Sequence, residues 1–298
     1  MALRLLRPCA AAAWRPLLAR GLASAPAGSA TAAIHADALL DDVAQLSTDA
    51  DVAPPLSLST TFTCGAPHVY SRSSNPGRAR AEALLGAIES TETCTVHAIL
   101  YSSGLAASFG ALAGLLPKRV AVAGGYHGTH QVLGMMQRIS GGASCATIPL
   151  PPPSEEALKV LQPGDVLWLE TPRNPDCEVM DIGAYVRLAK QVGDVKVIVD
   201  GTFAPPPLQR PLALGADVVM HSTTKSLSGH SDAIGGALCV ADECLAEQLR
   251  ADRGALGSVP GSLEVWLLQR SLRTLHLRVR QQSETAATLA AWLQVSAV

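Results

Sequence analysis

Six short apolar segments most constrain how this 298-residue chain folds. Their side chains do not alternate between apolar and polar, which indicates strands buried on both faces. Stretches with helical spacing separate them, a pattern typical of an α/β fold with helices on both faces of a mostly parallel sheet. The predicted strands are 96–101, 120–123, 166–170, 195–200, 217–221 and 235–240.

The intervening stretches supply the predicted helices. In 78–89, the apolar residues Ala81, Leu84, Leu85 and Ile88 recur at i, i+3, i+4 and i+7 and so share one face. The last stretch repeats leucines near helical spacing, which predicts a long helix or a helix pair over 263–293. Further helices are predicted at 105–116, 155–161, 182–191 and 241–250.

The N-terminal segment differs in composition from the rest of the chain. The first 36 residues contain arginine but no Asp or Glu, which is typical of a mitochondrial transit peptide. We therefore predict a leader over 1–33 and mitochondrial localisation, the alternatives being an unstructured terminus and a cytoplasmic protein. A polar arm with a non-helical 51–55 stretch is predicted at 34–61, lying on another surface, followed by the main domain at 62–255 and connecting helices at 256–298.

Charge and cysteine content exclude several classes of function. The net charge is -2, so neither a nucleic acid nor an anionic membrane is a predicted partner, and no apolar run is long enough to span a bilayer. The seven cysteines fit neither a zinc site nor a disulfide scaffold, so reduced and mostly buried thiols are expected. His127 and His130 have no evident third ligand, and no metal is predicted.

Ligands of open α/β sheets bind at the carboxyl ends of the strands. The strand 96–101 leads into Ser103 and Gly104 at a helix start, where free N–H groups can hold a phosphate, although a simple helix cap is an alternative. Asp200 ends another strand, where a buried carboxylate needs a cationic partner. A protonated pyridine nitrogen would serve, and a helix cap or an arginine pair are the alternatives.

The segment 221–232 is the most informative. Lys225 follows a buried strand among small hydroxyl residues, so we expect desolvation to favour its neutral, reactive amine. Ser222 and Thr224 alternate at the strand exit and can both face a phosphate. A solvent-exposed loop lysine is the alternative.

The segment 221–232, His-Ser-Thr-Thr-Lys-Ser-Leu-Ser-Gly-His-Ser-Asp, resembles the lysine signature of the Cys/Met-metabolism family of pyridoxal-phosphate (PLP) enzymes. That family includes cystathionine γ-lyases, β-lyases and γ-synthases. Five further segments resemble the family's motifs and follow in its order, namely 70–76, 103–105, 126–129, 170–175 and 200–204. The resemblance covers about 34–293 and implies the PLP-dependent transferase fold type I, with a seven-stranded sheet.

The resemblance also implies roles for individual residues. Lys225 would be the Schiff-base lysine and acid/base, Asp200 would keep the pyridine nitrogen protonated, and Tyr126 would stack on the ring and belong to the catalytic set. The remaining implied contacts to pyridoxal 5'-phosphate are Ser103, Gly104, Leu105, Ser222 and Thr224 at the phosphate, Asn174 at the ring hydroxyl, Thr202, and Tyr70 and Arg72 from a neighbouring subunit. A homodimer or homotetramer with shared sites is thereby implied.

The implied activity is transsulfuration, in which an amino-acid substrate forms an external aldimine, loses its α-proton to give a carbanion and eliminates across a C–S bond. A γ- or β-lyase is preferred, with γ-replacement as in the synthases as an alternative. The family's C-terminal domain, which carries the substrate-carboxylate arginine, is expected to be largely missing, which favours a second alternative, a catalytically dead relative. Val69, His127 and Gln131 depart from the family pattern and put cystathionine itself in doubt as substrate.

Overall fold

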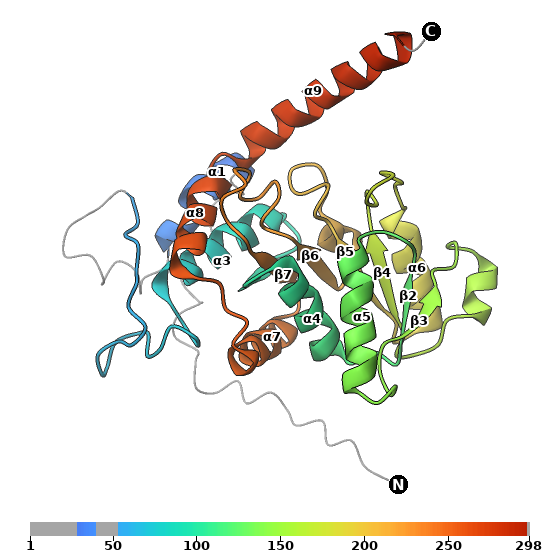
Figure 1. The fold of residues 1–298 in the computed structure, drawn as a ribbon, viewed down its shortest axis with the longest axis horizontal. Helices are drawn as coiled ribbons and strands as arrows, with labels where there is room; N and C mark the ends of the chain where they lie inside the picture. The colour runs from blue at the N-terminus through green and yellow to red at the C-terminus, as the bar shows by residue number, and fades with distance from the viewer. Residues whose placement is uncertain (1–28, 40–52, 297–298) are drawn as a thin grey trace.

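A seven-stranded sheet divides the protein into two helical layers (Figure 1). The computed structural model describes residues 29–39 and 53–296. The strand order is β1-β7-β6-β5-β4-β2-β3, and all neighbours run parallel except that β7 is antiparallel to β1 and β6. This confirms the predicted mostly parallel sheet. The strands are β1 (His97–Tyr101), β2 (Arg119–Val122), β3 (Ala146–Pro149), β4 (Val166–Glu170), β5 (Lys196–Asp200), β6 (Val218–His221) and β7 (Gly236–Val240).

The helices agree with the sequence pattern in most places. The described α-helices are α1 (Ser29–His35), α3 (Pro76–Glu89), α4 (Gly104–Leu115), α5 (His127–Ile139), α6 (Ile182–Val192), α7 (Glu243–Leu256), α8 (Ser262–Leu272) and α9 (Leu275–Ser296). The described residues also form three 3-10 helices, η1 (Ala36–Leu39), η2 (Glu155–Lys159) and η3 (Pro211–Leu214). The predicted helix over 155–161 is therefore wrong in type, and the predicted C-terminal element is a pair, α8 and α9.

Alternate residues of the strands pack into cores on opposite faces of the sheet. On one face, residues such as Trp168 and Ile198 pack with α4, α5 and α7. On the other face, Leu167 and Val199 pack with α6, while the β1–β7 end packs with α1, α3, α8 and α9. Burial on both faces explains why the strand sequences lack polar alternation.

The N-terminal arm lies on the α3–α8 side of the molecule where it is described. Asp37 is buried and accepts hydrogen bonds from Gln269 at 3.0 Å and from Arg273 at 2.9 Å, and the indole of Trp266 donates to the carbonyl of Pro54 at 3.0 Å. These described parts of the arm pack against α3 and α8, and its residues 40–52 lie outside the described residues, so the arm as a whole stays a prediction. Helix α9 extends away from the rest of the protein (Figure 1).

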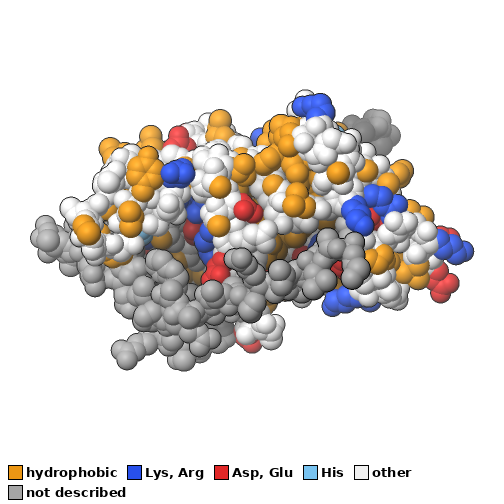
Figure 2. Space-filling view, turned by 90° about the horizontal axis from the view of Figure 1, so that it is seen from below, with side chains coloured by type: hydrophobic (Ala, Val, Ile, Leu, Met, Phe, Trp, Pro, Cys, Tyr) orange, Lys and Arg blue, Asp and Glu red, His pale blue; other side chains and the backbone are white. Residues whose placement is uncertain are grey.

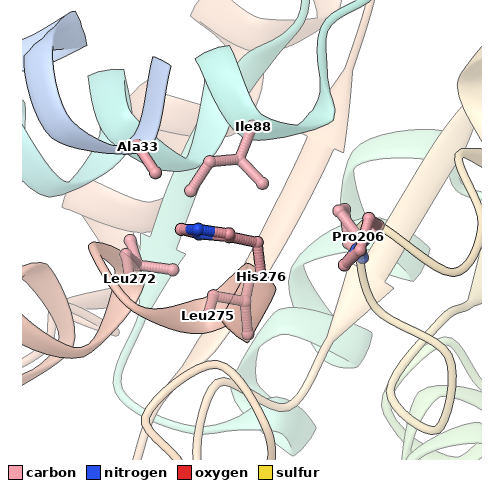
Figure 3. Close-up of a pocket in the computed structure, with 7 residues that line it drawn as sticks. Ala33, Ile88, Pro206, Leu272, Leu275 and His276 are labelled. Atoms are coloured by element: carbon pink, nitrogen blue, oxygen red, sulfur yellow. The ribbon is translucent and has the colours of Figure 1, made fainter. Parts of the chain in front are cut away.

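The α1 helix begins within the predicted leader. Its Ala33 is buried and lines a cavity of about 10 Å³ with Ile88, Leu272, Leu275 and His276 (Figure 3). Residues 1–28 of the predicted leader lie outside the described residues, so the leader remains a prediction.

Surface charge, helix hydropathy and cysteine burial can be compared with the predictions made from composition. On the face seen in Figure 2, basic and acidic side chains are interspersed among the described residues. None of the described helices has the length and apolar character needed to cross a membrane. Cys64, Cys177 and Cys244 are exposed, so the expectation of mostly buried thiols is wrong, although all six described cysteines are free.

Candidate active site

The predicted site residues gather at one edge of the sheet. Strands β4, β5 and β6 are parallel neighbours, so Glu170, Asp200 and His221 end side by side. Helix α4 begins at the same edge, because a Cβ on Gly104 would lie 3.0 Å from the Cβ of Ser222. The topology therefore brings three sequence-distant motifs together.

Asp200 is the buried carboxylate of this edge. It is 5% exposed, and one of its oxygens accepts a hydrogen bond from the Thr202 N–H at 3.0 Å. Burial raises the pKa of Asp200 to about 6, against the lowering effect of the hydrogen bonds from Thr202. None of the described ion pairs includes Asp200. A cationic group placed opposite it would therefore stabilise the ionised carboxylate.

The start of α4 forms a cradle for an anion. The Ser103 hydroxyl caps the helix by accepting from the Ala106 N–H at 3.0 Å. The N–H groups of Gly104 and Leu105 belong to the first turn, which has no intrahelical acceptors. Gly104 approaches Ser222 so closely that an added Cβ would press on the Ser222 side chain, at 3.0 Å from its Cβ and 3.2 Å from its hydroxyl.

Two hydroxyl side chains tie the neighbouring loops together. Thr202 accepts a hydrogen bond from the Ser222 N–H at 2.9 Å and so joins the exits of β5 and β6. The Thr224 hydroxyl donates to the Gly235 carbonyl at 3.2 Å and accepts from the Gly235 N–H at 3.1 Å. Thr224 thus holds the start of β7 beside the lysine segment, and its predicted phosphate contact stays a prediction.

Lys225 follows β6 on the loop that leads to β7. Its N–H donates to Ser222 O at 3.2 Å, and its carbonyl accepts from the Gly229 N–H at 2.7 Å. The side chain is exposed. The expectation that the protein chain desolvates this amine is therefore wrong, because the loop places it at the open edge of the sheet.

Tyr126 and Leu105 meet above a glycine. A Cβ on Gly128 would lie 2.5 Å from the Tyr126 ring and 2.9 Å from Leu105. The Tyr126 ring is 38% exposed and lies 4.7 Å, centroid to centroid, from the His127 ring. An exposed aromatic face at this edge is suited to stacking on a flat ligand.

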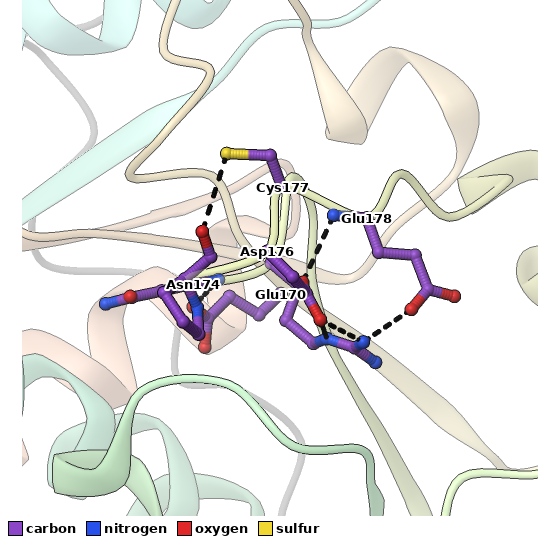
Figure 4. Close-up of polar contacts among 7 residues, drawn as sticks. Glu170, Asn174, Asp176, Cys177 and Glu178 are labelled. Atoms are coloured by element: carbon purple, nitrogen blue, oxygen red, sulfur yellow. Dashed lines mark hydrogen bonds and ion pairs between the residues drawn. The ribbon is translucent and has the colours of Figure 1, made fainter. Parts of the chain in front are cut away.

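Glu170 organises two loops, a role that sequence reasoning missed. Its carboxylate accepts hydrogen bonds from the backbone N–H of Tyr126 and from that of Asn174, both at 2.8 Å. Figure 4 shows the hydrogen bond to Asn174. The side chain is buried. Its position at the end of an otherwise apolar strand is the same signal that identified Asp200. In the adjoining loop, Arg173 pairs with Asp176 and Glu178 and holds the turn (Figure 4).

A second buried pair lies behind the site and was also missed. The Nε2 atom of His221 is 2.6 Å from Oε1 of Glu89, and both side chains are almost fully buried. A Cβ on Gly201 would lie 2.9 Å from the His221 ring, so the imidazole lies directly against the residue that follows Asp200.

Tyr70 and Arg72 do not join the cluster around Lys225 within one chain. They line a cavity of about 330 Å³ together with Asn75, Arg78 and the start of α8, and none of the other predicted cofactor residues lines that cavity. The Arg72 guanidinium lies 5.5 Å from the centroid of the Tyr70 ring.

The described residues fit pyridoxal 5'-phosphate. Asp200 offers a buried carboxylate for a pyridinium nitrogen, and the α4 start with Ser222 offers N–H and hydroxyl donors for a phosphate. Lys225 supplies an amine on the neighbouring loop, and Tyr126 an exposed ring. No group of three potential metal ligands occurs among these or the other described residues.

The sheet order and this edge define a PLP-dependent enzyme of fold type I. A model of the family described as Cys/Met metabolism PLP-dependent enzyme matches residues 30–297, and the chain belongs to that family. Membership confirms the predicted cofactor and the predicted class of transsulfuration enzyme.

Named relatives include both lyases and synthases. The probable cystathionine gamma-synthase of Herpetosiphon aurantiacus is 36% identical over 274 residues, covering 89% of this chain and 82% of that protein. The cystathionine gamma-lyase of Saccharomyces cerevisiae is 36% identical over 275 residues, covering 89% and 67%. The human cystathionine gamma-lyase is 35% identical, covering 82% and 60%.

Solved structures agree in fold. The crystal structure of yeast cystathionine gamma-lyase superposes with a TM-score of 0.79 at 32% identity and covers 91% of this chain and 69% of that one. The cystathionine gamma synthase of Xanthomonas oryzae pv. oryzae, in complex with cystathionine, gives the same TM-score and identity and covers 90% and 69%. The chain thus spans between 60% and 82% of the lengths of these relatives.

Proposed function

We propose that this chain is a carbon–sulfur lyase that converts a sulfur-containing amino acid and water into a thiol, a keto acid and ammonia. The observation that carries the proposal is that Asp200 ends β5 while Lys225 follows the adjacent parallel strand β6. An amine that moves protons and a carboxylate that holds a positive ring nitrogen are the two groups this chemistry requires from the protein.

Each residue of the edge has a part in the proposed reaction. When bound, PLP supplies an electron sink for the negative charge that develops at the substrate α-carbon. Asp200 holds the proton on the ring nitrogen, and Lys225 Nζ takes the proton from the α-carbon and returns protons later. Gly104, Leu105, Ser222 and Thr224 would bind the phosphate, Asn174 would contact the ring hydroxyl and Tyr126 would stack on the ring. Thr202, which donates to Asp200 and accepts from Ser222, would keep these two residues in place.

The test is keto-acid release by the PLP-loaded chain from cystathionine, cysteine and homocysteine. We expect Lys225→Ala to abolish release and to leave no cofactor attached after borohydride reduction, whereas Lys190→Ala, which changes an exposed lysine of α6, should retain both. If the native chain fixes the cofactor but releases no keto acid from any substrate, the proposal fails and a dead relative is the better description. If Lys225→Ala keeps both properties, the assignment of Lys225 is wrong.

Replacement at the γ-carbon is a second candidate, favoured by the similarity to the Herpetosiphon and Xanthomonas synthases. In that reaction a thiol displaces the leaving group of an O-activated homoserine and forms a thioether. Incubating the chain with both reactants and measuring thioether against keto acid separates the two candidates. Predominant thioether would favour the synthase.

Our proposal for the class of substrate rests on the residues near Tyr126. His127 and Gln131 are exposed in the first turns of α5, where similar enzymes of the family have glycine and arginine. The absence of a guanidinium at position 131 removes a partner for a distal carboxylate. A smaller or differently charged thioether or thiol amino acid is therefore proposed, and Gln131→Arg should raise kcat/KM for cystathionine relative to cysteine.

We also propose a homodimer or homotetramer with shared sites. The support is that Tyr70 and Arg72 line a cavity apart from the Lys225 edge and are exposed, so a neighbouring copy can present them to that edge. Mixing Lys225→Ala with Arg72→Ala chains should restore some activity if sites are shared, and sedimentation should give the subunit number. Mitochondrial import, supported by the acid-free leader, is tested by tagging the full chain and imaging cells.

A further inference from the structure

Arg278 in the first turn of α9 spans the gap between that helix and the loop that carries Lys225. Its Nη1 donates to the carbonyl of Ser226 at 2.8 Å, and its Nη2 donates to the carbonyl of Leu227 at 3.3 Å. These are the two residues that directly follow Lys225. One guanidinium thus contacts the lysine segment at two successive peptide groups.

The same guanidinium is fixed at its other side. Its Nη2 also donates to the carbonyl of Ser271 at 2.8 Å, and its Nε donates to the Thr274 hydroxyl at 3.2 Å. Both acceptors lie at the junction of α8 and α9. The described chain contains no ion pair between Arg278 and a carboxylate. The Arg278 side chain is therefore held by hydrogen bonds from its planar guanidinium to neutral oxygen atoms, and not by an ion pair with a carboxylate.

Gly229 shows how closely the loop and the guanidinium approach. A Cβ at position 229 would lie 1.9 Å from Nη1 of Arg278, and the glycine adopts a φ of 71°. The Gly229 N–H donates to the Lys225 carbonyl at 2.7 Å, which closes the turn that begins at the lysine. The turn and the arginine therefore fit only with a glycine at this position.

A second contact joins the same two regions. His230, which follows the turn, has its Nδ1 2.5 Å from the Ser228 carbonyl and 3.3 Å from the Ser271 hydroxyl. Ser271 is thus linked to both ends of the segment 226–230, to one through its carbonyl and Arg278, and to the other through its hydroxyl and His230.

We propose that Arg278 is a positioning residue that fixes the backbone after Lys225 and so sets where the lysine amine stands. Its importance for catalysis rests on the proposed function, because the lysine must be the cofactor-binding group. A misplaced amine loses rate steeply, since proton transfer requires the donor and acceptor within hydrogen-bond reach.

The test compares Arg278→Lys with Arg280→Lys. Lysine at 278 keeps the positive charge but cannot donate to three carbonyls in a plane, and Arg280 is an exposed arginine two residues further on the same helix. We measure amide hydrogen exchange of Ser228 and Gly229 in the PLP-loaded chain, the rate at which cofactor becomes fixed to Lys225 by borohydride, and kcat and KM separately.

For Arg278→Lys we expect about tenfold faster exchange at both amides, a comparable slowing of cofactor fixation, and a fall in kcat with a smaller change in KM. Arg280→Lys should match the native chain. Unchanged exchange and fixation in Arg278→Lys would overturn the proposal.

Two further variants keep the test decisive if Arg278→Lys does not fold. Thr274→Val removes only the hydroxyl that orients Nε, and should move exchange and fixation in the same direction by a smaller factor. Gly229→Ala should reproduce the defect without changing the arginine, and native behaviour of both would refute the role of Arg278. Exchange and fixation do not depend on keto-acid release, so a chain without lyase activity but with these effects would contradict the proposed function alone.

Discussion

The imidazole of His221 and the carboxylate of Glu89 lie 2.6 Å apart in the interior between α3 and β6. Neither the second carboxylate oxygen of Glu89 nor Nδ1 of His221 has a hydrogen-bond partner within the described chain. Each buried side chain therefore depends on the other for its hydrogen bond, because its remaining polar atom has no partner among the described residues. The pair lies next to Gly201, so it supports the segment that carries Asp200.

Removing one member of this pair should be costly. Glu89→Ala leaves a buried imidazole without a partner, and we expect the free energy of unfolding to fall by about 3 kcal/mol. Urea unfolding measures the change, with Glu92→Ala, at an exposed position near by, as the control. Equal stability of the two variants would show that the pair contributes little.

The raised pKa of Asp200 predicts a pH dependence in the cofactor-free protein. Because the folded-state pKa of about 6 exceeds the ordinary value of 3.8, the folded state holds more protons than the unfolded state between these pH values. Stability from this group is present below pH 4 and is lost as the pH rises through 6, by about 3 kcal/mol.

Asp200→Asn isolates this contribution. Unfolding of the two cofactor-free chains in urea at pH 4 and pH 7 should show that the native chain loses about 2 kcal/mol more than the variant on going to pH 7. Bound PLP should reduce the loss, since a cationic ring opposite Asp200 favours the charged carboxylate. The same pH dependence in both chains would contradict the burial of an uncompensated carboxyl group.

Glu170→Gln should loosen the loops of Tyr126 and Asn174. The amide retains one acceptor oxygen and presents an NH₂ group to a backbone N–H, so one of the two hydrogen bonds is lost. We expect a stability loss of about 2 kcal/mol and faster cofactor dissociation, measured by denaturant unfolding and by absorbance after dilution. Glu155→Gln, at an exposed site in η2, is the control, and identical dissociation in the two variants would exclude the clamp.

Gly104→Ala should weaken cofactor binding with little effect on folding. The added methyl group would lie 3.0 Å from the Ser222 Cβ and 3.2 Å from its hydroxyl, which displaces the donors of the anion cradle. We expect about tenfold weaker PLP binding, equal to about 1.4 kcal/mol, by titration of the cofactor-free chain. Gly134→Ala in α5, where a Cβ meets nothing within 4 Å, should bind normally.

Much of the fold could be predicted because buried strands carry an unmistakable pattern. Strand β4 has the predicted bounds and all of its residues are buried. Strand β3 was missed because it is a short edge strand, mostly exposed, that ends in Pro149. Helix α5 was missed because Gly128 and Gly134 interrupt its helical signal, and its stability comes from packing against the sheet.

The site could be predicted where topology alone brings residues together. Asp200 and the lysine segment follow adjacent parallel strands, so the strand assignment placed them at one edge. The pairing of Glu89 with His221 joins residues 132 positions apart, and the contact of Arg278 with Ser226 crosses from α9. Such contacts depend on side-chain packing between elements, which no local pattern encodes.

The reversed direction of β7 has a mechanical consequence for Lys225. Because β7 runs antiparallel to β6, the segment between them leaves and re-enters the sheet at one place, and Thr223 N–H to Gly235 O closes its base at 3.0 Å. The segment that carries Lys225 is therefore anchored to the sheet at both ends, through β6 and β7. With the backbone anchored in this way, we expect Lys225 Nζ to move between the atoms with which it exchanges protons by rotation about the bonds of its four methylene groups.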